Sequence, residues 1–147
     1  MIRGATIRLD LPSSFEILDL VQLVSDDIGR RARLDEDALH SMGVAVRESV
    51  INAVKHGNGN DSRKRVHVEF TELNEQDGGG VLIRVRDEGP GFDPSTLPDC
   101  LAPENLLKCS GRGFFLIRSF MDELVLARAP EGGMELRMVK RLQHQRA

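Results

Sequence analysis

The order in which hydrophobic periodicities change along this chain limits its fold more than any other feature of the sequence. Alternating apolar and polar residues predict strands at residues 5–11, 65–71, 81–87, 124–127 and 134–141. Apolar spacings of three to four residues predict helices at residues 14–30, 36–56 and 112–121. Two helices thus follow the first strand directly, which disfavours the single alternation of a doubly wound parallel sheet. We predict an α/β fold, a two-layer sandwich of a mixed, mostly antiparallel sheet with helices on one face.

A long irregular segment separates the third predicted strand from the third predicted helix. Residues 88–110 hold four prolines, small polar residues and only short apolar pairs. A compact domain seldom carries an irregular loop of roughly twenty residues without a functional reason. The rest of the chain shows no internal repeat and no linker composition, so we predict one domain over residues 1–147.

The bulk composition narrows the class of protein. The chain has 147 residues, and 40% of them are hydrophobic, which is enough for the core of one domain. A net charge of −3 disfavours a direct nucleic-acid binder, which needs a basic surface. No segment approaches the ~20 apolar residues of a membrane span, so we expect a cytoplasmic protein without a membrane partner. Cys100 and Cys109 lack the spacing of zinc ligands and are expected to be free thiols.

A polar ridge interrupts the second predicted helix within the segment ESVINAVKHGN, residues 48–58. Glu48, Asn52 and His56 follow one another at spacings of four, which places them on one face of an α-helix. One interpretation is an ordinary solvated helix face. The other is a carboxylate and an amide arranged around a ligand. For His56 we predict a structural role at the helix end.

A second candidate lies at the end of the third predicted strand, in the segment RVRDEGPGF at residues 84–92. Asp87 ends an apolar strand, and Gly89 and Gly91 follow it closely. Glycines permit close approach of the backbone to a ligand, and the carboxylate can accept a hydrogen bond from a heterocyclic amine. The alternative interpretation is an Asp-containing turn that binds nothing.

A third candidate, the segment CSGRGFFLI at residues 109–117, opens the third predicted helix. Gly111 and Gly113 would leave free backbone N–H groups at a helix N-terminus, which suits phosphate. Arg112 between them could add a phosphate contact. The alternative is a glycine-rich helix start without a ligand, and no GxxxxGK[ST] pattern of a P-loop occurs.

The three segments together are more specific than any one of them. The amide oxygen of Asn52 suits Mg²⁺, which prefers hard oxygen ligands and brings phosphate oxygens with it. Asp87 can anchor the amino group of a purine, and Gly111 and Gly113 can hold phosphates. Glu48 stands one turn from Asn52, where it can act as a general base. The set therefore suits a magnesium-bound purine nucleotide.

This constellation resembles the GHKL ATPase superfamily, which includes gyrase, heat-shock chaperone, histidine kinase and mismatch-repair ATPases. The Glu-x-x-x-Asn helix is similar to its N box, residues 87–91 to its first glycine box and residues 111–113 to its second. The resemblance covers residues 7–141 and implies the Bergerat fold of that superfamily. It implies Glu48 as catalytic base, Asn52 as Mg²⁺ ligand and Asp87 as the adenine anchor. It further implies ATP contacts from the paired glycines and an ATP lid at about residues 92–110.

Within the superfamily, ESVINAVKHGN and SGRGFFLIRSFMDEL are most similar to the small anti-sigma-factor serine kinases of bacteria. That resemblance implies phosphorylation of a serine on a STAS-domain anti-anti-sigma protein. It also implies that a sigma factor competes with this protein for binding, and that the kinase can form a homodimer. One departure is Met134, which follows Gly133 where family members often carry a threonine.

Two other functions compete with this one. The chain could be a catalytically inactive ATP-binding module that sequesters a partner, although a pure binder has no need of a base at Glu48. It could also be a detached histidine-kinase catalytic domain, although no helical dimerisation segment with a phosphoacceptor histidine precedes the domain. The predicted function is therefore an ATP-dependent serine protein kinase that switches between partners.

Overall fold

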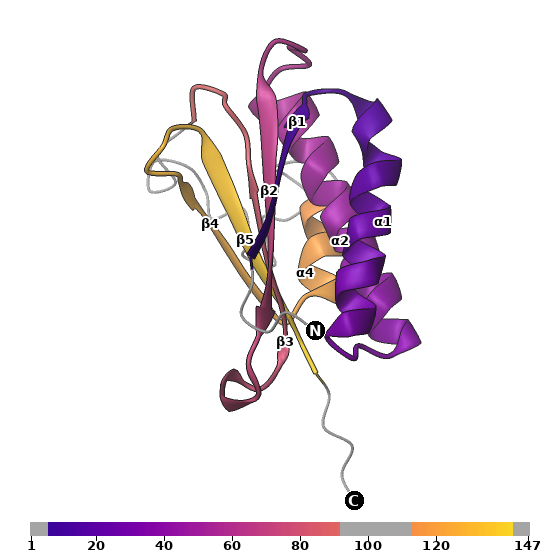
Figure 1. Ribbon diagram of the computed structural model, residues 1–147. Coiled ribbons are helices and arrows are strands. Elements are labelled where there is room, and N and C mark those ends of the chain that lie inside the picture. The colour runs from indigo at the N-terminus through magenta and orange to yellow at the C-terminus, as the bar shows by residue number, and fades with distance from the viewer. Residues whose placement is uncertain (1–5, 92–112, 143–147) are drawn as a thin grey trace, which may run out of the picture.

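The computed structural model of the chain describes residues 6–91 and 113–142. Five strands form one sheet: β1 (Thr6–Pro12), β2 (Arg65–Leu73), β3 (Gly80–Arg86), β4 (Glu123–Arg128) and β5 (Met134–Arg141). Their order across the sheet is β1-β2-β3-β5-β4, and each neighbouring pair is antiparallel. Helices α1 (Leu18–Arg31), α2 (Glu36–Asn52) and α4 (Gly113–Phe120) cover one face of the sheet (Figure 1).

The predicted two-layer α/β sandwich with a mostly antiparallel sheet is confirmed. The five strands and three helices lie at the predicted places along the chain. The sheet is more uniform than the prediction of a mixed sheet, because all four pairings among the described strands are antiparallel. The predicted lid at residues 92–110 lies outside the described residues, and the single domain over residues 1–147 stays a prediction.

The core lies between the inner face of the sheet and the helices. Alternate residues of the central strands point into it, which is the expected period of two for a half-buried strand. Phe70 of β2 and Ile83 of β3 are almost fully buried, as are Met42 and Val50 of α2. Helix α4 packs on α2, so the segment that follows the undescribed residues is attached to the same core. The core thereby fixes the end of α2 relative to the end of β3.

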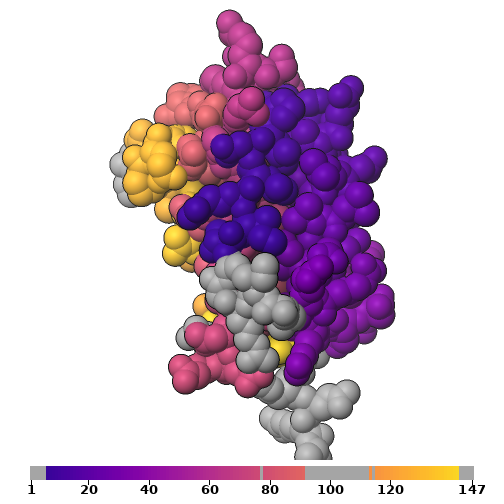
Figure 2. Space-filling model, viewed as in Figure 1, coloured from indigo at the N-terminus to yellow at the C-terminus, as the bar shows by residue number. Residues whose placement is uncertain are grey.

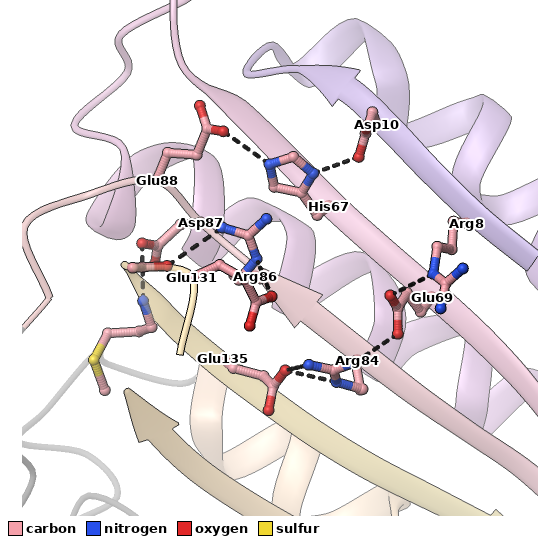
Figure 3. A network of polar contacts seen from close by, with 12 residues as sticks. Arg8, Asp10, His67, Glu69, Arg84, Arg86, Asp87, Glu88, Glu131 and Glu135 are labelled. Carbon is pink, nitrogen blue, oxygen red and sulfur yellow. Dashed lines mark hydrogen bonds and ion pairs between the residues drawn. The ribbon is translucent and has the colours of Figure 1, made fainter. Parts of the chain in front are cut away.

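The outer face of the sheet carries a ladder of charged residues across four strands. Arg8 of β1 contacts Glu69 of β2, Glu69 contacts Arg84 of β3, and Arg84 contacts Glu135 of β5 (Figure 3). Cross-strand pairs of opposite charge stabilise a solvated sheet surface. The charged outer face of the sheet is therefore suited to contact with solvent. The helices cover the apolar inner face (Figure 1).

Three short helical turns complete the described chain: η1 (Phe15–Ile17), η2 (Ala53–Gly57) and η3 (Glu75–Asp77). Figure 2 shows β1 and α1, both in indigo, meeting side by side on one surface of the molecule. No helix among residues 6–91 and 113–142 is long and apolar enough to cross a membrane.

Candidate functional site

Glu48 and Asn52 lie one turn apart on α2, on the side that faces the start of α4. A methyl group added at Gly113 would lie 3.3 Å from both amide atoms of Asn52 and 3.5 Å from Glu48 Oε2. Glycine at this first residue of α4 thus lets the helix start against both polar side chains. The structure therefore brings together one residue from the predicted second glycine box and the two polar residues of the predicted N box.

The amide nitrogen of Asn52 is buried and has no hydrogen-bond partner among the described residues. A buried donor without a partner costs about 1–3 kcal/mol, so such groups are rare in folded proteins unless they serve a function. Glu48 is half-buried, and no hydrogen bond or ion pair joins it to the described part of the chain. The Glu48 carboxylate and the Asn52 amide nitrogen therefore make no hydrogen bond to the described residues.

The predicted ridge does not continue to His56, and the reason is a change of helix type. The α-helix ends at Asn52, and Ala53–Gly57 form a π-helical turn. Asn52 and His56 are thus not four residues apart along one regular α-helix, as the predicted ridge requires. The side chain of His56 is exposed. Single π turns within α-helices occur frequently at functional sites, and this one follows directly after Asn52.

Asp87 lies just after β3 and is buried, with 6% of its surface exposed. Its Oδ1 accepts hydrogen bonds from the backbone N–H of Gly89 at 2.9 Å and of Met134 at 3.1 Å. Its own backbone N–H donates to the carbonyl of Met134. Its Oδ2 accepts no hydrogen bond from the described residues, so one carboxylate oxygen is anchored and the other is available.

Three glycines pack closely around Asp87. A methyl group at Gly57 would lie 2.0 Å from Asp87 Oδ2, and one at Gly133 would lie 2.1 Å from the Asp87 carbonyl oxygen. A methyl group at Gly89 would lie 1.9 Å from the carbonyl oxygen of Gly57. The sequence predicted that Gly89 lets a ligand approach the backbone, and this stays a prediction. In the structure the missing side chain of Gly89 lets the turn pack against the last residue of η2. Gly91 has a φ of 68° and so needs glycine for its backbone conformation.

Asn58 is a functional candidate that the sequence interpretation missed. It is buried, with 2% of its surface exposed. Its Oδ1 accepts a hydrogen bond from the backbone N–H of Glu88 at 2.7 Å. Its Nδ2 donates to Ser13 Oγ at 3.2 Å and to the Arg65 carbonyl at 2.9 Å. An asparagine among glycines reads as a turn residue in sequence, and only its burial shows that it joins three segments.

A second set of polar contacts supports the turn after β3 from the outer face of the sheet. His67 of β2 hydrogen-bonds to Asp10 of β1 through Nδ1, and to Glu88 Oε2 through Nε2 at 2.9 Å (Figure 3). The other oxygen of Glu88 accepts from the backbone N–H of Arg65 at 2.8 Å. The bond to His67, followed by that backbone N–H, holds the pKa of Glu88 below its usual value. The same histidine lowers the pKa of Asp10.

The remaining predicted site residues lie outside the described part of the chain. Gly111 and Arg112, with the predicted phosphate contacts, precede the first described residue of α4. Cys100 and Cys109 lie in the same range, so their prediction as free thiols is not tested.

The described residues fit a magnesium-bound purine nucleotide. The buried amide nitrogen of Asn52 has no hydrogen-bond partner among the described residues, and the amide oxygen of Asn52 is of the hard type that Mg²⁺ prefers. Asp87 offers a fixed carboxylate with one oxygen left for an amine donor. Gly113 leaves space where a side chain would press on Asn52. No group of three or more histidine, cysteine or acidic residues among the described ones could hold a metal by itself, so phosphate and water oxygens would complete the coordination.

Comparison with known proteins agrees with this arrangement. The sequence profile of the histidine kinase-like ATPase domain matches residues 11–140. The serine-protein kinase RsbW of Staphylococcus aureus is 31% identical, in an alignment that covers 91% of this chain and 85% of that protein. The protein of the same name from Staphylococcus epidermidis is 30% identical with the same coverage.

A solved structure shows the same fold. It contains the RsbU and RsbW domains of a Mycobacterium tuberculosis protein and aligns with a TM-score of 0.67 at 18% sequence identity. The alignment covers 95% of this chain and 33% of that longer chain. At this identity the likeness concerns the fold alone, whereas the profile and the staphylococcal proteins concern the sequence. The chain therefore belongs to the histidine kinase-like ATPase family, among its RsbW-related members.

Proposed function

We propose that this protein is an ATP-dependent serine protein kinase and anti-sigma factor. Its substrate would be a serine of a STAS-domain anti-anti-sigma protein, and a sigma factor would compete for the same kinase. The observation that carries this proposal is the pairing of Glu48 with the buried, unpartnered amide of Asn52 against Gly113. A protein that only grips a partner has no need to hold a carboxylate and an unpartnered amide side by side.

Asp87 would hold the adenine. Two backbone N–H groups fix its Oδ1, so Oδ2 can accept a hydrogen bond from the amino group of the base. A buried carboxylate that is already oriented loses little entropy when the ligand arrives. Gly57 and Gly133 pack against this carboxylate without side chains, and Gly91 turns the chain away in a left-handed conformation. The close packing of Gly57 and Gly133 thus fixes the place of the carboxylate that would contact the base.

Asn52 would bind Mg²⁺ through its amide oxygen, and its buried nitrogen would be left for a nucleotide oxygen or a water. Gly113, with Gly111 and Arg112, would hold the phosphates through backbone N–H groups and the guanidinium. Mg²⁺ bound there supplies positive charge that offsets the negative charge of the phosphate oxygens. The protein's own contribution is to fix the positions of these groups before the nucleotide binds.

Glu48 would take the proton from the serine hydroxyl. Its carboxylate lies one helical turn before Asn52 and faces the same start of α4. Phosphoryl transfer depends mainly on positioning and on charge stabilisation, and a positioned base adds typically 10²–10⁴-fold. Because Glu48 makes no hydrogen bond to the described residues, it is available to a hydroxyl group.

The staphylococcal relatives support the kinase activity, since their name states that they phosphorylate serine in proteins. The STAS-domain substrate, the sigma factor, the cytoplasmic location and a homodimer remain parts of the proposal.

The deciding experiment incubates the protein with γ-labelled ATP, Mg²⁺ and purified STAS-domain proteins encoded near its gene. We expect label on one of these proteins in a linkage that is stable to acid and labile to strong alkali, as phosphoserine is. Label that acid releases would indicate phosphohistidine and the function of a histidine kinase. ATP binding without any transfer, while the protein captures a STAS protein, would favour the catalytically inactive module.

A further inference from the structure

The turn that carries Asp87 is held by a residue outside the three predicted motifs. Asn58 lies just beyond the π turn, and its buried side chain reaches three segments that are distant in sequence. Ser13 follows β1, Arg65 starts β2 and Glu88 follows β3. The side chain of Asn58 thus links the ends of three strands to the chain that follows η2.

The two ends of the Asn58 amide have different tasks. Nδ2 donates to Ser13 Oγ and to the Arg65 carbonyl, which connects the edge strand with its neighbour. Oδ1 accepts the backbone N–H of Glu88 at 2.7 Å, the residue next to Asp87. The bonds of Nδ2 contribute to stability. The bond of Oδ1 holds the backbone next to Asp87.

We infer that Asn58 is a positioning residue that sets the adenine contact of Asp87. The inference rests on the proposed function, because it concerns the same adenine contact. The bond from Glu88 N–H to Asn58 Oδ1 stands on one side of Asp87, and the bonds from Gly89 and Met134 hold the carboxylate itself. Without the Asn58 oxygen, the Glu88 N–H would be left without that partner and the turn could move. The Asp87 carboxylate would then no longer be positioned to accept a hydrogen bond from the base.

The readout is the preference for adenine over hypoxanthine, measured as the ratio of dissociation constants for IDP and ADP. IDP differs from ADP at the edge of the base that Asp87 would recognise, because a carbonyl at C6 and an N–H at N1 replace the 6-amino group and the N1 acceptor. A site built around a hydrogen bond disfavours the analogue that cannot make it, so we expect wild-type protein to prefer ADP by about tenfold or more. A change that only loosens the fold weakens both nucleotides alike and leaves the ratio unchanged.

Three substitutions separate the two tasks of Asn58. Asn58→Ala removes both, and Asn58→Leu does so while keeping the volume, in case the alanine variant does not fold. For either we expect the preference for ADP to fall to within about threefold of unity, in line with the loss of one oriented hydrogen bond. Asn58→Asp keeps an acceptor for the Glu88 N–H but loses the donor to the Arg65 carbonyl. It should melt at a lower temperature and yet keep most of the preference.

Ser13→Ala is the matched control, since it removes a partner of Nδ2 and leaves the bond to Glu88 intact. It should keep the full preference for ADP. If Asn58→Ala or Asn58→Leu binds nucleotide with the wild-type ratio, Asn58 acts only on stability and the inference is overturned. If wild-type protein itself binds ADP and IDP equally, the role proposed for Asp87 fails instead. The two failures are therefore distinguishable in one set of titrations, all performed on the full chain below its melting temperature.

Discussion

The two sides of the proposed nucleotide site are built in opposite ways. On the side of the turn after β3, hydrogen bonds occupy Asp87 Oδ1, Glu88 and Asn58, and only Asp87 Oδ2 is left available. On the side where α2 meets α4, Glu48 has no hydrogen bond to the described residues and the buried amide nitrogen of Asn52 has no partner. The proposed adenine side, the finished side, thus has its hydrogen bonds in place before a ligand binds, whereas the proposed phosphate side, the unfinished side, lacks them.

Two asparagines six residues apart show this difference most clearly. Asn58 uses both ends of its amide in bonds to the protein. Asn52 leaves its buried nitrogen unpaired. Asparagine therefore links segments of the protein at position 58, whereas at position 52 its amide nitrogen has no partner among the described residues. The hydrogen bonds that each side chain makes without nucleotide distinguish the two roles. The following predictions test the difference between the two sides.

The largest effect on nucleotide affinity is expected at Gly57, where the finished side is most crowded. Gly57→Ala would place a methyl group 2.0 Å from Asp87 Oδ2, so the carboxylate has to move. We expect ADP affinity to fall at least tenfold, which corresponds to about 1.4 kcal/mol, with a loss of stability of about 1–3 kcal/mol from overpacking. Calorimetric titration and denaturant unfolding measure the two effects.

Gly59→Ala is the control for Gly57→Ala. A methyl group there would meet no atom within 4 Å, but its φ of 61° disfavours any other residue. The variant should lose about 1–2 kcal/mol of stability through backbone strain while ADP affinity stays unchanged. If both variants lose affinity to the same extent, crowding at Asp87 is not the cause.

A smaller effect is expected on the unfinished side. Asn52→Ala should weaken the binding of ATP in the presence of Mg²⁺ by about tenfold, or about 1.4 kcal/mol. Stability without nucleotide should rise by about 1–3 kcal/mol, because the substitution removes a buried donor that has no partner among the described residues. Asn58→Ala, in contrast, should lower the stability, because it removes hydrogen bonds that the side chain makes to the protein. Magnesium-dependent affinity that survives in Asn52→Ala would count against metal ligation.

The smallest effect concerns the support of the turn from the outer face. The pKa of Glu88 is held below its usual 4.5 by His67 and by the Arg65 N–H, so the unfolded chain binds this proton more readily than the folded protein. The resulting stability is fully present above the usual value and is lost as the pH falls below it and through the lower pKa of the folded protein. Glu88→Gln should therefore flatten the decline in unfolding free energy between about pH 5 and pH 3.

The change for Glu88→Gln should stay below about 1 kcal/mol, because the carboxylate is partly exposed and its ion pair is screened by solvent. Glu36→Gln, which removes a carboxylate on the first turn of α2 without any contact to His67, should leave the slope of the wild type. Equal slopes in the wild-type and Glu88→Gln proteins would show that His67 and Glu88 do not support the turn.

Much of the fold could be predicted from the sequence because the strands alternate and the helices keep their spacing. Val66, Val68 and Phe70 show the period of two that places them in the core. The end of α2 could not be predicted, since the apolar spacing continues through Val54 while the backbone changes to a π turn. That change moves His56 away from the ridge to which its spacing assigned it.

Candidate site residues could be chosen from the sequence where one side chain would carry the chemistry, and not where packing decides the role. Glu48, Asn52 and Asp87 could be singled out because the segments that hold them, taken together with the glycines at residues 111–113, are more specific than any one of them. Asn58 could not, because its importance depends on strands that are distant in sequence. The task of Gly89 was also hidden, since only the fold shows that the Gly57 carbonyl lies against it.

One paired measurement on Glu48→Gln tests the central claim most directly. The substitution keeps the shape of the side chain and removes its ability to take a proton. We predict that ATP affinity stays within about twofold of wild type, because Glu48 belongs to the unfinished side and not to the adenine side. Transfer of labelled phosphate to the serine of the STAS-domain partner should fall by at least ~100-fold. Transfer within tenfold of wild type, or loss of transfer together with loss of ATP binding, would contradict the account.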